Sequence, residues 1–176
     1  GCAEQFKEAY QEIQSKGIRS LIIDLRDNGG GIVDEAMEIA DYILDKDTTM
    51  LITVDKKQEE EVTKAKQEPI VKLPIVVLVN DGTASASEML AGALQDTRKA
   101  TIVGKTTYGK GVIQELYTLS DGSGLKITIK EYFTPNRNKI NKVGIKPDYE
   151  VEYEKDKEDA QLNKAIEILR LSSQSF

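Results

Sequence analysis

The sequence predicts an α/β fold with a mostly parallel central sheet and βαβ crossovers, to which a β-hairpin and a C-terminal helix are added. Short apolar runs bounded by turn residues, typical of strands in parallel sheets, alternate with segments whose apolar residues recur every three or four positions. Strands that are separated by helices imply right-handed crossovers and therefore parallel neighbours. A chain of 176 residues is long enough to form one domain with a substantial core.

The first unit is a helix followed by a strand, a glycine loop and a second helix. Residues 3–14 have apolar side chains at helical spacing, and Gly17 is placed to end that helix. The apolar run 21–25 predicts a strand that is buried on both faces. The glycine-rich loop 26–31 ends this strand, and the helical period returns over 32–45.

The order of strand, loop and helix then repeats. Residues 50–54 predict a strand, and the mostly charged stretch 56–72 is interpreted as a surface loop or a short solvated helix. The apolar run 75–79 predicts another buried strand. After a turn, the helical spacing over 85–94 predicts the helix that follows it.

Beyond residues 101–103 the helical pattern gives way to strands. Residues 112–118 and 125–133, which are separated by a turn containing glycine, predict a β-hairpin. A short strand over 148–153 and a helix over 160–171 complete the expected elements.

The composition excludes several kinds of functional site. The chain has no histidine, so it cannot hold a Ser-His-Asp or Cys-His catalytic site or a histidine-ligated metal. Its single cysteine cannot form an internal disulfide or a cysteine-rich metal site. The net charge of -6 argues against nucleic-acid binding, and no apolar run is long enough to span a bilayer. The glycine loop lacks the phosphate-binding and dinucleotide-binding motifs, and we expect neither a cofactor nor a metal.

Ser85 is the first candidate catalytic residue. It would lie at the start of a helix that follows a buried strand, at the edge where open α/β sheets bind ligands. The unpaired amides of the first helical turn would favour a developing oxyanion there. Ser85 and Glu88 also have the spacing of a capping box, which has a structural role. The segment alone therefore allows either a nucleophile or a helix cap.

Two further segments could take part in the chemistry. The glycines of 28–31 could supply oxyanion-binding amides or could only permit a tight turn. Lys110 lies between two glycines and is either a solvated cation or, if enclosed among apolar groups, a neutral general base. Gln114 would reach Lys110 only if the strand between them bends. Without histidine, a Ser–Lys dyad is the form of hydroxyl activation open to this chain.

Five segments in consistent order resemble the carboxyl-terminal processing protease family, also called tail-specific proteases. They are LIIDLRDNGGG at 21–31, IVVLVNDGTASASEMLAGALQD at 75–96, IVGKTTYGKGVIQ at 102–114, LSDGSGLKITIKEYFTP at 119–135 and VGIKPD at 143–148. The resemblance implies a ClpP/crotonase-like spiral core. It also implies serine-type hydrolysis of protein or peptide substrates near their C-termini, without a cofactor or a metal.

The resemblance assigns roles to individual residues. Ser85, the first serine of SASE, matches the nucleophile of the family. Lys110 of the GKG motif matches the general base, and Gln114 matches the residue that orients this lysine. The backbone oxyanion hole maps to the amides of Ala86 and Gly31, and Gly31 is preferred over Gly30.

The resemblance further implies a larger protein around residues 1–176. Family members usually carry an N-terminal export or anchor segment and a PDZ domain that recognises substrate C-termini. Neither is visible here, so residues 1–176 are interpreted as the serine peptidase catalytic core, which could be inactive by itself. An extracytoplasmic location, in a bacterial cell envelope or secreted, is expected by resemblance, although this chain shows no targeting segment.

Two other interpretations stay open. A catalytically silent core would bind peptides or partner proteins and would leave Lys110 too far from Ser85 to act as its base. An acyl-thioester enzyme of the crotonase type would share a related core and a backbone oxyanion hole. That enzyme would need a CoA-binding site, for which the sequence contains no support.

Overall fold

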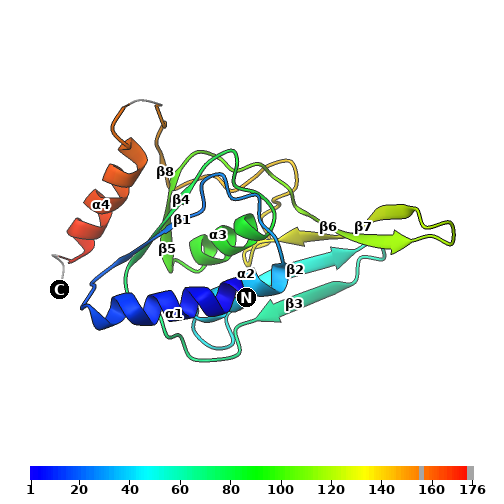
Figure 1. Ribbon diagram of the computed structural model, residues 1–176, viewed down its shortest axis with the longest axis horizontal. Helices are drawn as coiled ribbons and strands as arrows, with labels where there is room; N and C mark the ends of the chain where they lie inside the picture. The colour runs from blue at the N-terminus through cyan, green and yellow to red at the C-terminus, as the bar shows by residue number, and fades with distance from the viewer. Residues whose placement is uncertain (155–156, 174–176) are drawn as a thin grey trace.

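The computed structural model describes residues 1–154 and 157–173 and contains two sheets. The helices are α1 (Cys2–Ser15), α2 (Val33–Asp41), α3 (Ala86–Asp96) and α4 (Ala160–Ser173). The strands are β1 (Leu21–Asp24), β2 (Thr49–Asp55), β3 (Glu60–Lys64), β4 (Ile75–Val79), β5 (Ala100–Gly104), β6 (Val112–Thr118), β7 (Gly124–Phe133) and β8 (Tyr149–Glu150). One sheet is parallel with the order β1-β4-β5-β8, and the other is antiparallel with the order β3-β2-β7-β6 (Figure 1).

The parallel sheet is covered by helices on both faces. Every residue of its strand β4 is buried. Alternate residues of β4 face two different cores: Val77 packs with residues of α1, α2 and α3, whereas Val76 and Leu78 pack with Ala165 of α4. Figure 1 shows α4 on one side of this sheet and the other helices on the opposite side. This two-sided cover explains the continuous apolar run of β4.

Strand β1 lies at an edge of the parallel sheet. Its residues Leu21, Ile22 and Ile23 contact the two cores but are only half-buried, and Asp24 is exposed. Both faces of β1 are therefore covered, as predicted, but the strand is buried only in part. The reason is that, within the described residues, β1 has a neighbouring strand on one side only.

The antiparallel sheet contains the predicted hairpin, formed by β6 and β7. Strand β2 pairs antiparallel with β7 and so belongs to this sheet. The expectation that strands separated by a helix are parallel neighbours was therefore wrong for β1 and β2. The hairpin extends beyond the body of the domain in Figure 1. The predicted fold class is confirmed, since a parallel sheet with crossover helices, a β-hairpin and a C-terminal helix are all present.

The charged stretch 56–72 contains an edge strand, β3, so its interpretation as a surface loop or a short solvated helix was wrong. β3 pairs antiparallel with β2, and Val62 lies opposite Ile52. Charged residues are common at sheet edges because they prevent further strands from adding. Here Glu60 and Glu61 are exposed and form ion pairs with residues at or near β7. These charges concealed the strand from a search for apolar periodicity.

Two further features complete the description of the helices. α2 ends at Asp41, before the predicted end at residue 45. Ile43 and Leu44, whose apolar side chains continued the helical spacing, are buried in the turn that follows. In the part of the chain that the structure describes, no helix combines the length and the apolar character that crossing a membrane requires.

Candidate active site

Three loops meet at one edge of the parallel sheet. They follow β1, β4 and β5 and include residues 25–32, 80–85 and 105–111. The carboxyl ends of parallel strands lie at the same edge, so these loops are neighbours although they are distant in sequence. The backbone N–H of Tyr108 donates to the carbonyl of Thr83 at 3.0 Å, which joins the second loop to the third.

Ser85 has a strained backbone at the turn between β4 and α3. Its φ of 58° and ψ of -122° lie in a region that residues with a side chain rarely adopt. Strain of this kind persists where the surrounding structure enforces it, and it is characteristic of nucleophiles on sharp strand-to-helix turns. Ser85 itself is half-buried. A helix cap alone does not require this conformation, so the backbone favours the nucleophile interpretation.

Gly30 packs directly against this turn. Its φ is +86°, and a Cβ atom there would lie 2.6 Å from the Ala84 carbonyl oxygen and 2.7 Å from the Ala86 nitrogen. The backbone N–H of Gly30 is occupied by a hydrogen bond to Asn28 Oδ1 at 3.0 Å. Within the described residues, the N–H groups of Gly31 and Ala86 donate no hydrogen bond. The glycine loop thus brings an unused donor close to the serine turn.

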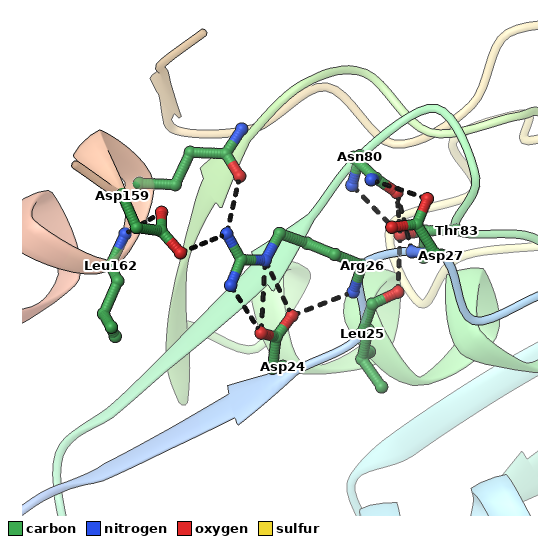
Figure 2. A network of polar contacts seen from close by, with 9 residues as sticks. Asp24, Leu25, Arg26, Asp27, Asn80, Thr83, Asp159 and Leu162 are labelled. Carbon is green, nitrogen blue, oxygen red and sulfur yellow. Dashed lines mark hydrogen bonds and ion pairs between the residues drawn. The ribbon is translucent and has the colours of Figure 1, made fainter. Parts of the chain in front are cut away.

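Hydrogen bonds of polar side chains connect the loop after β1 to the loop after β4, as Figure 2 shows. Asn80 accepts the backbone N–H of Asp27 at 2.9 Å and donates its amide to the Asp27 carboxylate at 3.0 Å. The Thr83 hydroxyl donates to the carbonyl of Leu25 at 2.7 Å. These bonds cross between the two loops, so they fix the glycine loop relative to the serine.

Glu88 connects the serine loop to the lysine loop. Its fully buried carboxylate accepts the backbone N–H of Ser85 at 2.8 Å and that of Lys110 at 2.9 Å on the same oxygen atom. The other oxygen accepts the N–H of Gly109 at 2.7 Å and the hydroxyl of Thr107. A buried carboxylate is tolerated only when it is so fully hydrogen-bonded. Glu88 therefore does more than cap α3.

Tyr132 supports the same two loops from β7. Its buried hydroxyl donates to the carbonyl of Lys110 and lies 3.2 Å from the carbonyl oxygen of Ser85. Burial raises the pKa of this hydroxyl, and the charge of Glu88 raises it further. Tyr132 consequently remains a hydrogen-bond donor over the ordinary pH range.

The side chains of Lys110 and Gln114 do not form the contacts that a dyad requires. Among the described residues, the half-buried Lys110 ammonium has no hydrogen-bond or ion-pair partner, and no hydrogen bond joins it to the Ser85 hydroxyl. The exposed Gln114 amide donates to the hydroxyl of Thr128 at 3.3 Å. The β-bulge between Ile113 and Gln114 is a bend of the kind that would be needed to bring Gln114 to Lys110.

An apolar pocket of about 320 Å³ opens beside the serine turn. Its lining includes Gly31 and Ala86, which carry the unused N–H groups. Apolar side chains of Leu25, Ile39 and Leu90 form part of its wall. The pocket can therefore receive an apolar side chain next to these two donors.

Comparison with known proteins decides the family. A sequence model described as "Peptidase family S41" matches residues 1–151. The chain belongs to peptidase family S41. The predicted resemblance to carboxyl-terminal processing proteases, which are serine-type peptidases, is thereby confirmed.

Named relatives of this S41 chain are processing proteases. It is 45% identical over 153 residues to "Carboxyl-terminal-processing protease" of Synechocystis sp., covering 85% of this chain and 36% of that protein. It is 44% identical over 142 residues to "Carboxyl-terminal-processing peptidase 1, chloroplastic" of Arabidopsis thaliana, covering 80% and 29%. The solved structure of "Photosystem II D1 C-terminal processing protease" is similar with a TM-score of 0.80 and 38% identity, covering 86% and 39%. The S41 chain spans about a third of the length of the curated relatives it matches.

Sequence reasoning missed several residues that shape this candidate site. Tyr132 and the polar residues Asn80 and Thr83 were not singled out, and Glu88 was considered only as part of a capping box. A signal for two of them was present: Asn80 directly follows a buried strand, and Glu88 is an acidic residue in a helix of mainly small and apolar residues. Nothing local in the sequence indicates that Tyr132 reaches the serine loop.

Proposed function

We propose that this chain is the catalytic core of a serine endopeptidase that cleaves protein substrates near their C-termini. In this proposal Ser85 is the nucleophile, Lys110 is the general base, and Gln114 orients the lysine. The observation that carries the proposal is the strained backbone of Ser85 beside the unused N–H groups of Gly31 and Ala86. Donors aimed at a developing oxyanion contribute strongly to acyl transfer, and a glycine loop against a strained serine supplies them.

The proposed reaction proceeds through an acyl-enzyme. A neutral Lys110 amine accepts the Ser85 hydroxyl proton while the oxygen attacks the scissile carbonyl carbon. Gly31 and Ala86 N–H groups bind the oxyanion of the tetrahedral intermediate. As the C–N bond breaks, the protonated lysine gives its proton to the leaving amine. Water then attacks the acyl carbon while Lys110 takes its proton. As the ester bond breaks, the protonated lysine returns that proton to the Ser85 oxygen.

Proton transfer in this scheme requires rotation of the Lys110 side chain. The backbone nitrogens of Ser85 and Lys110 share one Glu88 oxygen, so the lysine starts close to the serine. Its flexible four-carbon side chain can change rotamer without movement of this backbone. Gln114 would have to exchange its bond to Thr128 for one to Lys110. The reaction therefore needs side-chain rearrangement around a backbone that is already held in place.

The pocket beside Gly31 supports a preference for apolar side chains next to the scissile bond.

We extend the proposal to the natural setting of residues 1–176. They act there as the peptidase core of a longer protein, whose PDZ domain would capture substrate C-termini. The expected location is extracytoplasmic, as the resemblance to the family implies.

One observation favours a second function, a catalytically silent core that binds peptides. The missing hydrogen bond between Ser85 and Lys110 is what that function predicts. A serine-directed phosphonate distinguishes the two functions because only an activated serine reacts with it. The peptidase proposal expects labelling and peptide cleavage, both of which are abolished in Ser85→Ala and Lys110→Ala. Cleavage that persists in either variant, or an unreactive Ser85, would contradict it.

A further inference from the structure

Arg26 lies where β1, the glycine loop and α4 meet (Figure 2). Its guanidinium donates to the Asp24 carboxylate at 2.9 and 2.6 Å. On the opposite side it donates to Asp159 Oδ2 at 2.8 Å and to Gln161 Oε1 at 3.2 Å. The side chain of Arg26 is only 17% exposed. A planar guanidinium held by three side chains has little freedom to move.

The two partners from the α4 side are themselves held in place. Asp159 Oδ1 accepts the backbone N–H of Leu162 at 3.0 Å, so one carboxylate binds both α4 and Arg26. Gln161 is fully buried, and its amide donates to the carbonyl of Val151 at 2.8 Å. Both side chains therefore present their remaining oxygen to Arg26 in a fixed orientation.

Arg26 begins the loop that contains the proposed oxyanion donor. Asp24 Oδ1 also accepts the backbone N–H of Arg26 at 3.0 Å, which fixes its backbone together with its side chain. The next residue, Asp27, has a left-handed φ of 56°, and its backbone N–H donates a hydrogen bond to Asn80 Oδ1. Rotation of the peptide group after Arg26 would therefore displace residues 28–30, which lead to Gly31.

We propose that Asp159 and Gln161 are positioning residues, which act through Arg26 to hold the Gly31 N–H in the orientation that binds the oxyanion. This inference rests on the proposed function, in which that N–H stabilises the tetrahedral intermediate. The match to the S41 family ends at residue 151, so both residues lie outside it. The C-terminal helix thus contributes to catalysis as well as covering the sheet.

The test compares Asp159→Asn with Glu167→Gln in the 176-residue chain. Asp159→Asn removes the charge that faces Arg26 while leaving a side chain of the same shape. Glu167 lies in α4, which begins directly after Asp159; its exposed carboxylate forms an ion pair with Lys164, and it serves as the matched control. We expect phosphonate labelling of Ser85 to be about tenfold slower in Asp159→Asn and unchanged in Glu167→Gln, since small displacements of an oxyanion donor are costly.

A second readout does not depend on activity. The amide resonance of Gly31 in ¹⁵N-labelled protein should shift in Asp159→Asn and not in the control. An unchanged resonance, or labelling at the wild-type rate, would overturn the inference even if the variant unfolds at a lower temperature. If unmodified protein is not labelled at all, the proposed function fails, whereas the Gly31 resonance still reports the coupling of the loop to α4.

A double variant tests whether Asp159 acts through Arg26. Lysine at position 26 keeps the positive charge. It lacks the planar guanidinium that binds Asp24 on one side and Asp159 and Gln161 on the other. We expect Arg26→Lys to slow labelling, and we expect the addition of Asp159→Asn to cause no further loss. Additive losses would show that Asp159 acts by another route and would overturn the assignment.

Discussion

The buried carboxylate of Glu88 holds the backbone N–H of Lys110 at 2.9 Å with the same oxygen that accepts the N–H of Ser85. The proposed nucleophile and base therefore come from loops that meet on one side chain. Glu88 therefore links their backbones, although no hydrogen bond joins their side chains.

Glu88→Gln should be strongly destabilising. An amide group would place donors against two of the N–H or O–H groups that now face carboxylate oxygens. We expect a loss of about 2 to 4 kcal/mol in the free energy of unfolding, measured in urea, and a loss of most peptidase activity. Wild-type stability would contradict the central role of this carboxylate.

Gly30→Ala should disrupt the site, because its Cβ would clash with the serine turn and its φ is positive. We expect a stability loss of about 1 to 3 kcal/mol and little remaining activity. Gly29→Ala is the matched stability control, since the space around that position is open. Equal unfolding midpoints for the two variants would argue against the close approach of Gly30.

Tyr132 should make the stability of the protein pH-dependent in alkaline solution. Burial raises the pKa of its hydroxyl, so the folded chain keeps a proton that the unfolded chain releases near pH 10. The free energy of unfolding should therefore fall as the pH rises above about 10. Urea unfolding of Tyr132→Phe at the same pH values should show a shallower decline. Parallel declines in both proteins would exclude this tyrosine as the source.

Asp159 should contribute stability that is lost in acid. Burial tends to raise the pKa of its carboxyl, but hydrogen bonds from Leu162 and Arg26 together lower it below the usual value. Stability from this group is therefore present above about pH 4 and disappears as the pH falls further. The difference in unfolding free energy between wild type and Asp159→Asn should shrink in that acid range. A difference that stays constant with pH would contradict an ionised Asp159.

The sequence by itself determined the local elements and the position of the candidate residues within them. Apolar spacing predicted the helices and the buried strand β4, and turn residues located the hairpin. The same local patterns place Ser85 at the start of a helix and the glycine loop directly after an apolar strand. These properties depend on neighbours within a few positions, so they are visible in the chain itself.

Only the tertiary structure decided which of these residues meet. It placed β3 at a sheet edge despite its charges, put four donors around Glu88, and directed Gln114 to Thr128. It also joined Arg26 to Gln161 of α4, from which it is separated by most of the chain. Contacts of this kind depend on the packing of distant segments and on the rotamers that burial permits, neither of which any local pattern encodes.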